Sequence, residues 1–361
     1  MSLEYMSSWA NRNIPRKRDL SQIPSEFRPT IVPRVHRPEV ILSEKYQDVP
    51  MNEVIYPSMS FEDMYNIGSH RPNDRPHDRS RSDPKKAEAI DKRQYQIKKI
   101  ESGFSPQAME LRYQDKSYVF VILRHIGTTR DNDLWITSYN MIRRFYTNKI
   151  IIIDDNSTIN TVNGKLTNAE VIQSECNGAG EILPYYYFLK NKWADCMIFV
   201  HDSMFLHRRF TDEELDRPVS FHWHFNSEEF KGDRKIATYL SMLPHAAELV
   251  EYAAAEDWKG CFGGASMINL SVVEMLEENY QLFSKLILSI RNRKDRETFE
   301  RVLGILLCRE GLVDPARPSN FGAILRYPKA FESDSINYDT AAHILSQAKY
   351  DTAIIKVWRG R

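Results

Sequence analysis

Two neighbouring aspartates follow a strongly apolar run, where carboxylates could bind a small molecule. The run is four isoleucines at 150–153, and Asp154, Asp155 and Asn156 come directly after it. A short β-branched run bounded by turn-forming residues is typical of a strand buried on both faces, as at the centre of a parallel sheet. Ligands of open α/β sheets bind just beyond the carboxyl ends of such strands. The two carboxylates therefore either contact a ligand or only cap the following turn.

A second polar pair, His201 and Asp202, follows the strand predicted at 195–200. Asp202 could bind Mn²⁺ or Mg²⁺ through its carboxylate, and an imidazole ligand from His201 would favour Mn²⁺. The alternatives are that His201 only packs at the end of the strand, and that arginine and lysine side chains bind a phosphate group without any metal.

The elements that position these residues are a strand, a helix and a strand. The apolar run at 118–123 predicts a strand that ends at Arg124 and His125. An apolar stripe with helical spacing follows, formed by Trp135, Tyr139, Ile142 and Tyr146. The isoleucine strand comes next, which makes a βαβ crossover with both strand ends at one edge. We therefore expect Arg124 and His125 to lie beside the two aspartates.

A second unit of the same kind extends this edge. Residues 170–173 predict a short strand and 174–180 a loop of small residues. Residues 181–192 predict a tyrosine-rich helix whose regular part begins after Pro184. The glycines of the loop lack the spacing of a P-loop or of a dinucleotide-binding motif, so they are a weak phosphate signal. The strand predicted at 195–200 follows this helix and brings His201 and Asp202 to the same edge.

The rest of the folded part is less regular. Helices are predicted at 242–255, 271–291 and 295–310, and a glycine-bearing loop at 258–268 leads into a strand. The segment 354–361 predicts a short strand with a cationic end.

Residues 1–110 differ from the rest in composition. Proline recurs there, and the segment 71–86 is charged with almost nothing to bury. Such a segment cannot offset its ordering entropy, which predicts a partly extended or loosely ordered extension. It is a solvated spacer or a basic arm that holds a partner. The folded body is expected at 111–361, with halves at 111–210 and 211–361.

Composition argues against several kinds of partner and site. The 361 residues include 49 Lys plus Arg and 49 Asp plus Glu, so net charge gives no argument for a nucleic-acid partner. The four cysteines form no CxxC pair, which argues against a zinc site and a disulfide scaffold. No segment has the pattern of a signal peptide or the length of a membrane span. We expect a cytoplasmic protein without a transmembrane segment.

The order of these motifs resembles the GT-A glycosyltransferases, which use nucleotide-diphospho-sugars. The IIIDDNS turn resembles the turn that holds the nucleotide in that fold, and HDS at 201–203 falls where a metal-binding DxD motif belongs. HDS has one carboxylate where the family pattern has two. More narrowly, the segments IIIIDDNS, GEILPYYYFL, FVHDSMF, WKGCFGG, FERV and KVWRGR resemble glycosyltransferases of giant and large algal viruses, which would place the protein in a host cytoplasm.

The resemblance implies an α/β, Rossmann-like GT-A fold with a mostly parallel central sheet flanked by helices. It also implies a nucleotide-sugar donor, Mn²⁺ or Mg²⁺ on the diphosphate, with Asp202 and His201 as ligands, and a glycan or glycoprotein acceptor. The residues expected at the donor follow the first two strands or lie in the cationic tail: Arg124, His125, Asp154, Asp155, Asn156, Lys356, Arg359 and Arg361. The tail could equally be a solvated terminus, although an exposed Trp358 would be unusual there.

An inverting transferase needs a carboxylate base beside the acceptor hydroxyl. In the GT-A fold an acidic motif at the start of a helix supplies it, and KDRETFERV at 294–302 occupies that place. Asp295, Glu297 and Glu300 compete for the role. Asp295 is at the helix start, whereas Glu300, beside Phe299, is expected to point inward. A retaining enzyme needs none of them, and a helix surface of this composition is often only solvated.

The acceptor is expected at Trp223, His224, Gly263 and Gly264, because aromatic rings stack on sugars and glycines allow close approach. Aromatic clusters also form cores. The resemblance thus implies a glycosyltransferase. The alternatives are a catalytically inactive protein of the same fold that binds a sugar nucleotide or a glycan, and, more distantly, a nucleotidyltransferase.

Overall fold

The structure, a computed structural model, describes residues 99–159, 162, 164–228, 230–327 and 336–357, which lie in one compact unit. The predictions for most of the N-terminal extension and for Arg359 and Arg361 fall outside the described residues. Residues 99–110 pack on the folded body: Ile100 is fully buried, and Met109 forms a bridge with Tyr146.

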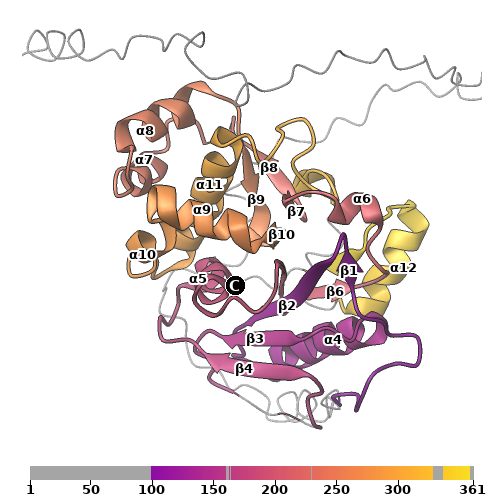
Figure 1. Cartoon of the computed structure of the whole chain (residues 1–361). Helices are drawn as coiled ribbons and strands as arrows, with labels where there is room; N and C mark the ends of the chain where they lie inside the picture. Colours follow the sequence, from indigo (N-terminus) through magenta and orange to yellow (C-terminus); the bar gives the residue numbers. More distant parts are fainter. Residues whose placement is uncertain (1–98, 160–161, 163, 229, 328–335, 358–361) are drawn as a thin grey trace, which may run out of the picture. The chain divides into compact units, whose positions relative to one another are not determined.

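A mostly parallel sheet forms the centre, as the sequence predicted, with strand order β4-β3-β2-β5-β10-β7 (Figure 1). Its parallel strands are β2 (Lys116–Arg124), β3 (Ile150–Asp154), β4 (Ala169–Gln173) and β5 (Cys196–His201). Two antiparallel contacts extend the sheet: β10 (Ser266–Asn269) pairs with β5 and with β7 (Val219–Phe221). The short β1 (Arg112–Tyr113) pairs antiparallel with β2. All five residues of β3 are buried, as expected of a β-branched strand inside a parallel sheet.

Helix α4 (Thr129–Phe145) connects β2 to β3. Thr128 and Asp131 cap its first turn reciprocally, which satisfies backbone N–H groups that have no partner within the helix. The predicted stripe is buried: Trp135 and Tyr139 have no exposed surface, and Ile142 is 2% exposed. This stripe fixes the crossover and therefore the edge at which both strands end.

Helices flank the sheet, as Figure 1 shows. They are α5 (Leu183–Asn191), α6 (Asp212–Leu215), α7 (Arg234–Leu240), α8 (Ala246–Ala255), α9 (Leu270–Tyr280), α10 (Leu282–Leu286), α11 (Arg293–Arg309) and α12 (Tyr338–Ala348). Short 3₁₀ turns are η3 (Gly180–Ile182), η4 (Phe262–Gly264) and η5 (Ile324–Arg326). None of the helices in the described part of the chain is long and apolar enough to cross a membrane.

Two small sheets complete the fold. In one, β8 (His224–Asn226) pairs with β9 (Lys259–Cys261). In the other, β11 (Ile354–Lys356) pairs antiparallel with β6 (Met204–Leu206), the strand that directly follows His201, Asp202 and Ser203. The second pairing brings the end of the described chain to the edge where the parallel strands end.

Candidate functional site

The carboxyl ends of β2, β3 and β5 meet, as the sequence predicted. Arg124 lies opposite Asp154 in the register of β2 and β3, and the Asp155 N–H donates to the Arg124 carbonyl over 2.9 Å. On the other side of β2, the Asp202 N–H donates to the carbonyl of Leu123 over 3.0 Å. The His125 N–H lies 3.3 Å from Asp202 Oδ2. The polar residues after three separate strands therefore form one group.

Arg124 and Asp154 hold this edge together. Arg124 Nε lies 2.7 Å from Asp154 Oδ2, and both side chains are 1% exposed. The guanidinium stacks over the Trp135 ring at 4.5 Å. The other oxygen of Asp154 accepts the Ser157 N–H over 2.9 Å, so Asp154 caps the turn that follows β3. This ion pair, expected at the donor, has internal partners and fixes the two strand ends.

Asp155 anchors the loop of small residues at 174–180. Its two oxygens accept the N–H groups of Gly178 at 2.6 Å and Gly180 at 3.1 Å. Burial raises the pKa of Asp155, and these two hydrogen bonds oppose the shift. Gly180 has φ +56°, and a Cβ there would overlap the Arg296 side chain. The carbonyl of Asp155 lies 2.6 Å from His125 Nδ1.

Asn156, expected at the donor, occupies the turn itself. Its backbone is left-handed, with φ 61°, and its side chain is exposed.

Glu181 extends the group, and sequence reasoning missed it. It follows the anchored loop, and its Oε2 lies 3.2 Å from Arg296 Nε. Burial raises the pKa of Glu181, which the positive charge of Arg296 opposes, and Asp155 and Lys356 are close enough to contribute. The only local signal was a carboxylate where the small-residue loop ends. Its partner Arg296 lies far along the chain, on α11.

A turn with two glycines joins His201 to Glu300. His201 Nε2 lies 2.6 Å from the Gly263 carbonyl, and the Gly263 N–H donates to Glu300. Gly263 has φ +63°, and a Cβ there would lie 2.9 Å from His201 Nε2, so the close approach needs glycine. Gly264 packs next to Glu181, where an added Cβ would lie 3.2 Å from the Glu181 Cβ.

Glu300 is 4% exposed and points inward, as its position beside Phe299 predicted. Burial raises the pKa of Glu300 well above its usual value, and the nearby charge of Glu181 raises it further. A carboxyl group with these neighbours keeps its proton to higher pH than an ordinary glutamate, and once ionised it is a stronger base. Perturbed carboxyl groups of this kind are frequent at catalytic sites.

The other two candidate bases lie in different surroundings. Asp295 Oδ1 pairs with Lys235 Nζ at 2.6 Å, and Oδ2 accepts the Arg291 N–H over 3.0 Å at the start of α11. Glu297 pairs with Arg293 at 3.1 Å along the same helix. Of the three carboxylates, Glu300 is the one that contacts the glycine turn.

Lys356 reaches the same edge through β11. It lies opposite Met204 in the pairing of β11 with β6, and it is 8% exposed. Its Nζ lies 5.7 Å from the centre of the Phe262 ring, directly before the two glycines. We call Asp155, Glu181, His201, Asp202, Glu300 and Lys356 the strand-end cluster.

Of the aromatic residues expected at the acceptor, Trp223 is fully buried and His224 is partly buried. Trp223 has no exposed surface and packs between Phe321 and Tyr327, with ring centroids 5.3 and 5.1 Å away. His224 Nδ1 lies 2.6 Å from Ser319 Oγ, and burial lowers the pKa of His224 to about 4. As placed, Trp223 presents no ring face to a sugar.

No family model matches the chain, and no curated protein matches it. The chemistry of the strand-end cluster is therefore inferred from its own side chains.

A divalent metal fits this cluster if the substrate supplies some of the ligands of the ion. Within the ranges that the structure describes, no group of three or more His, Cys, Asp or Glu side chains could hold a metal ion. His201 Nε2 is engaged by the Gly263 carbonyl. Mg²⁺ sites at substrate phosphates commonly use one or two carboxylates, with the phosphates and water as the other ligands. Asp202 could serve in this way.

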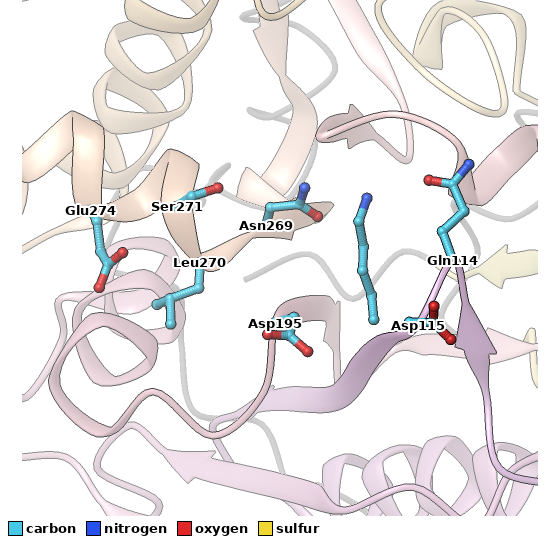
Figure 2. A pocket seen from close by; sticks show the side chains of 8 residues that line it. Gln114, Asp115, Asp195, Asn269, Leu270, Ser271 and Glu274 are labelled. Carbon is cyan, nitrogen blue, oxygen red and sulfur yellow. The ribbon is translucent and has the colours of Figure 1, made fainter.

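The hollow in Figure 2 lies at the other end of these strands, where β2 and β5 begin. Its volume is about 430 Å³, and Lys116, Asp195 and Asn269 are among the residues that line it. Asp195 accepts the backbone N–H and the hydroxyl of Ser117, which lowers the pKa of Asp195. The hollow is separate from the strand-end cluster.

Proposed function

We propose that the protein is a glycosyltransferase of the GT-A type, which moves a sugar from a nucleotide-diphosphate sugar to a hydroxyl group of a glycan or glycoprotein. The supporting observation is the strand-end cluster itself. It gathers side chains from widely separated segments at the carboxyl edge of a mostly parallel sheet, where α/β proteins bind ligands. A core of this kind normally buries apolar groups, so several buried ionisable groups with shifted pKa values favour a functional site.

Glu300 is the proposed base. Transfer with inversion requires that the acceptor hydroxyl lose its proton as its oxygen attacks the anomeric carbon. The Gly263 N–H fixes one side of the Glu300 carboxylate, and Glu181 raises the pKa of Glu300. Glu300 then takes the acceptor proton, and the bond from the sugar to the diphosphate breaks.

The departing diphosphate gains negative charge, which cationic groups must stabilise. Lys356 and Arg296 are two cations that could do so, because both lie close enough to Glu181 to affect its pKa. Arg296 also lies 3.4 Å from the Gly178 carbonyl through Nη1, so it spans the anchored loop. A metal ion bound to Asp202 and the diphosphate would supply further positive charge.

Nucleotide release from UDP-, GDP- and dTDP-sugars, with and without Mn²⁺, tests the proposal directly. We expect turnover with at least one donor, and its loss in Glu300→Gln but not in Glu297→Gln. Glu297 is the matched control because it lies on the same helix and pairs with Arg293 outside the glycine turn. Absence of both turnover and nucleotide-sugar binding would contradict the proposal.

One observation favours the alternative of a non-catalytic sugar-nucleotide or glycan-binding protein. The HDS segment has a single carboxylate, and its histidine is bound to the Gly263 carbonyl. Binding of a nucleotide sugar without release of nucleotide from any donor, under conditions in which the chain is folded, would support this alternative.

A further inference from the structure

Arg301, the residue after Glu300 on α11, is a buried cation that forms no ion pair in the part of the chain that the structure describes. It is 7% exposed, and its Nε is buried without a hydrogen bond. Among the residues that the structure describes, no carboxylate forms an ion pair with it. Buried guanidinium groups are normally paired, because removing an uncompensated charge from water is costly. A buried polar group left in this state calls for an explanation, and a ligand that pairs with it is one.

The position of the guanidinium is fixed by an aromatic ring. Arg301 Cζ lies 4.1 Å from the centre of the Phe230 ring, a close cation–π contact. The Phe230 N–H donates to the carbonyl of Ser227 over 2.9 Å. Ser227 is 1% exposed, and its hydroxyl is buried without a hydrogen bond. Two unsatisfied hydrogen-bond donors are thus associated with the same short turn, and both are of kinds that bind anionic oxygen.

This cation is also close to the proposed base. Arg301 follows Glu300 directly on the helix, and its positive charge opposes the upward shift of the Glu300 pKa. A group bound at Arg301 would therefore lie within electrostatic reach of Glu300. That neighbourhood belongs to the acceptor, because the donor diphosphate is assigned to Asp202, Lys356 and Arg296.

We propose that Arg301, stacked on Phe230, binds an anionic group of the acceptor, a carboxylate or a phosphate carried by a sugar. The identification of the ligand as the acceptor rests on the proposed transferase function. Anion binding at Arg301 can nevertheless be measured without any donor. The planar guanidinium donates two hydrogen bonds to such a group, which an ammonium group cannot do in the same geometry.

The same helix supplies a matched control. Arg309 also lies over an aromatic ring, Tyr280, at 5.9 Å. Unlike Arg301, it pairs with Glu248 at 2.9 Å and with Glu310 at 3.2 Å. Arg309 therefore has its charge compensated by the protein itself.

The test is calorimetric titration of the full chain with methyl glucuronide, glucose 6-phosphate and methyl glucoside, the neutral reference. We expect at least one anionic sugar to bind wild type and Arg309→Met at least about tenfold more tightly than the neutral sugar. Arg301→Met should lose that preference, and Arg301→Lys should regain part of it. The carboxylate and phosphate arms distinguish the two sources of charge. Equal affinity for charged and neutral sugars, or a preference that survives in Arg301→Met, would overturn the proposal.

Hydrogen exchange of the wild-type protein gives a second measurement that needs no variant. The anionic sugar should slow amide exchange around Ser227, Phe230 and Arg301 more than the neutral sugar does, with no such difference around Arg309. Exchange unchanged around Arg301 would overturn the proposal even if the variants did not fold. Anion binding without any glycosyl transfer would leave the Arg301 site in place and remove only the transferase function.

Discussion

Replacing Glu300 with glutamine should separate catalysis from stability. Glutamine keeps an oxygen that can accept the Gly263 N–H, but it cannot take a proton from an acceptor hydroxyl. Loss of a general base lowers the rate by roughly 10²–10⁴-fold. We expect kcat to fall by that factor, with little change in the affinity for the nucleotide sugar.

The stability of the same variant has a definite pH dependence. Folding raises the pKa of Glu300, because the carboxyl is buried and Glu181 is near, so the folded state binds more protons than the unfolded state. The contribution of Glu300 to wild-type stability is therefore fully present below the unfolded pKa of about 4.3. This contribution is lost as the pH rises from there through the folded pKa. Glutamine does not ionise, so Glu300→Gln does not lose stability in this way. As the pH rises through this range, the free energy of unfolding of the variant should increase relative to that of wild type by up to about 1.4 kcal/mol per pH unit.

Urea unfolding of both proteins between pH 4 and pH 8 measures the difference, with Glu297→Gln as the control. The charge of Glu297 is the smallest of the contributions that raise the Glu300 pKa, so Glu297→Gln should change the pH profile much less than Glu300→Gln does. If Glu300→Gln followed the wild-type profile across this range, Glu300 would not be ionising in the buried environment described. If its kcat were also intact, Glu300 could not be the base.

Three further variants test other parts of the site. Asp202→Asn should lose the Mn²⁺-dependent part of nucleotide-sugar binding, by about tenfold or more in Kd, and thermal shifts with and without Mn²⁺ that match wild type would exclude Asp202 as a ligand. Gly263→Ala should destabilise the fold by about 1–3 kcal/mol in urea unfolding, because φ is +63° and the new Cβ would lie 2.9 Å from His201 Nε2. Gly232→Ala is its control, with φ +83° and no atom within 4 Å of the added Cβ, and an equal loss in both variants would contradict the crowding at His201. Arg124→Met should cost about 3–5 kcal/mol, since it leaves Asp154 charged and buried, whereas Arg124→Met/Asp154→Leu should cost less. Equal losses in that single and double variant would argue against an uncompensated charge.

The sheet and the edge at which its parallel strands end were predictable because local sequence patterns specify them. Four isoleucines bounded by polar residues define β3, and the apolar stripe of α4 defines the crossover. Parallel pairing then places Arg124, Asp155 and Asp202 at one edge without further information. The breaks between helices were harder to predict. Gln281 ends α9 with φ 52°, although glutamine does not signal a left-handed conformation. His245 precedes α8 with φ 63°, and histidine is only a weak signal of that conformation.

The cluster itself was only partly predictable, because its members meet through contacts distant in sequence. Glu181 pairs with Arg296, and no local pattern links them. The choice among Asp295, Glu297 and Glu300 depends on how α11 is rotated against the glycine turn, which tertiary packing decides. Trp223 shows the same limit, since an aromatic residue beside histidines looks the same in sequence whether it faces a ligand or the core.

The pairing of β11 with β6 has a consequence for biogenesis. Lys356 is synthesised after every carboxylate of the cluster, so a nascent chain gathers these carboxylates, with Arg296 already beside Glu181, before the charge of Lys356 is present. Domains begin to fold during synthesis. An intermediate that includes Glu300 but lacks β11 would have one positive charge fewer at the strand ends, which the docking of β11 then supplies.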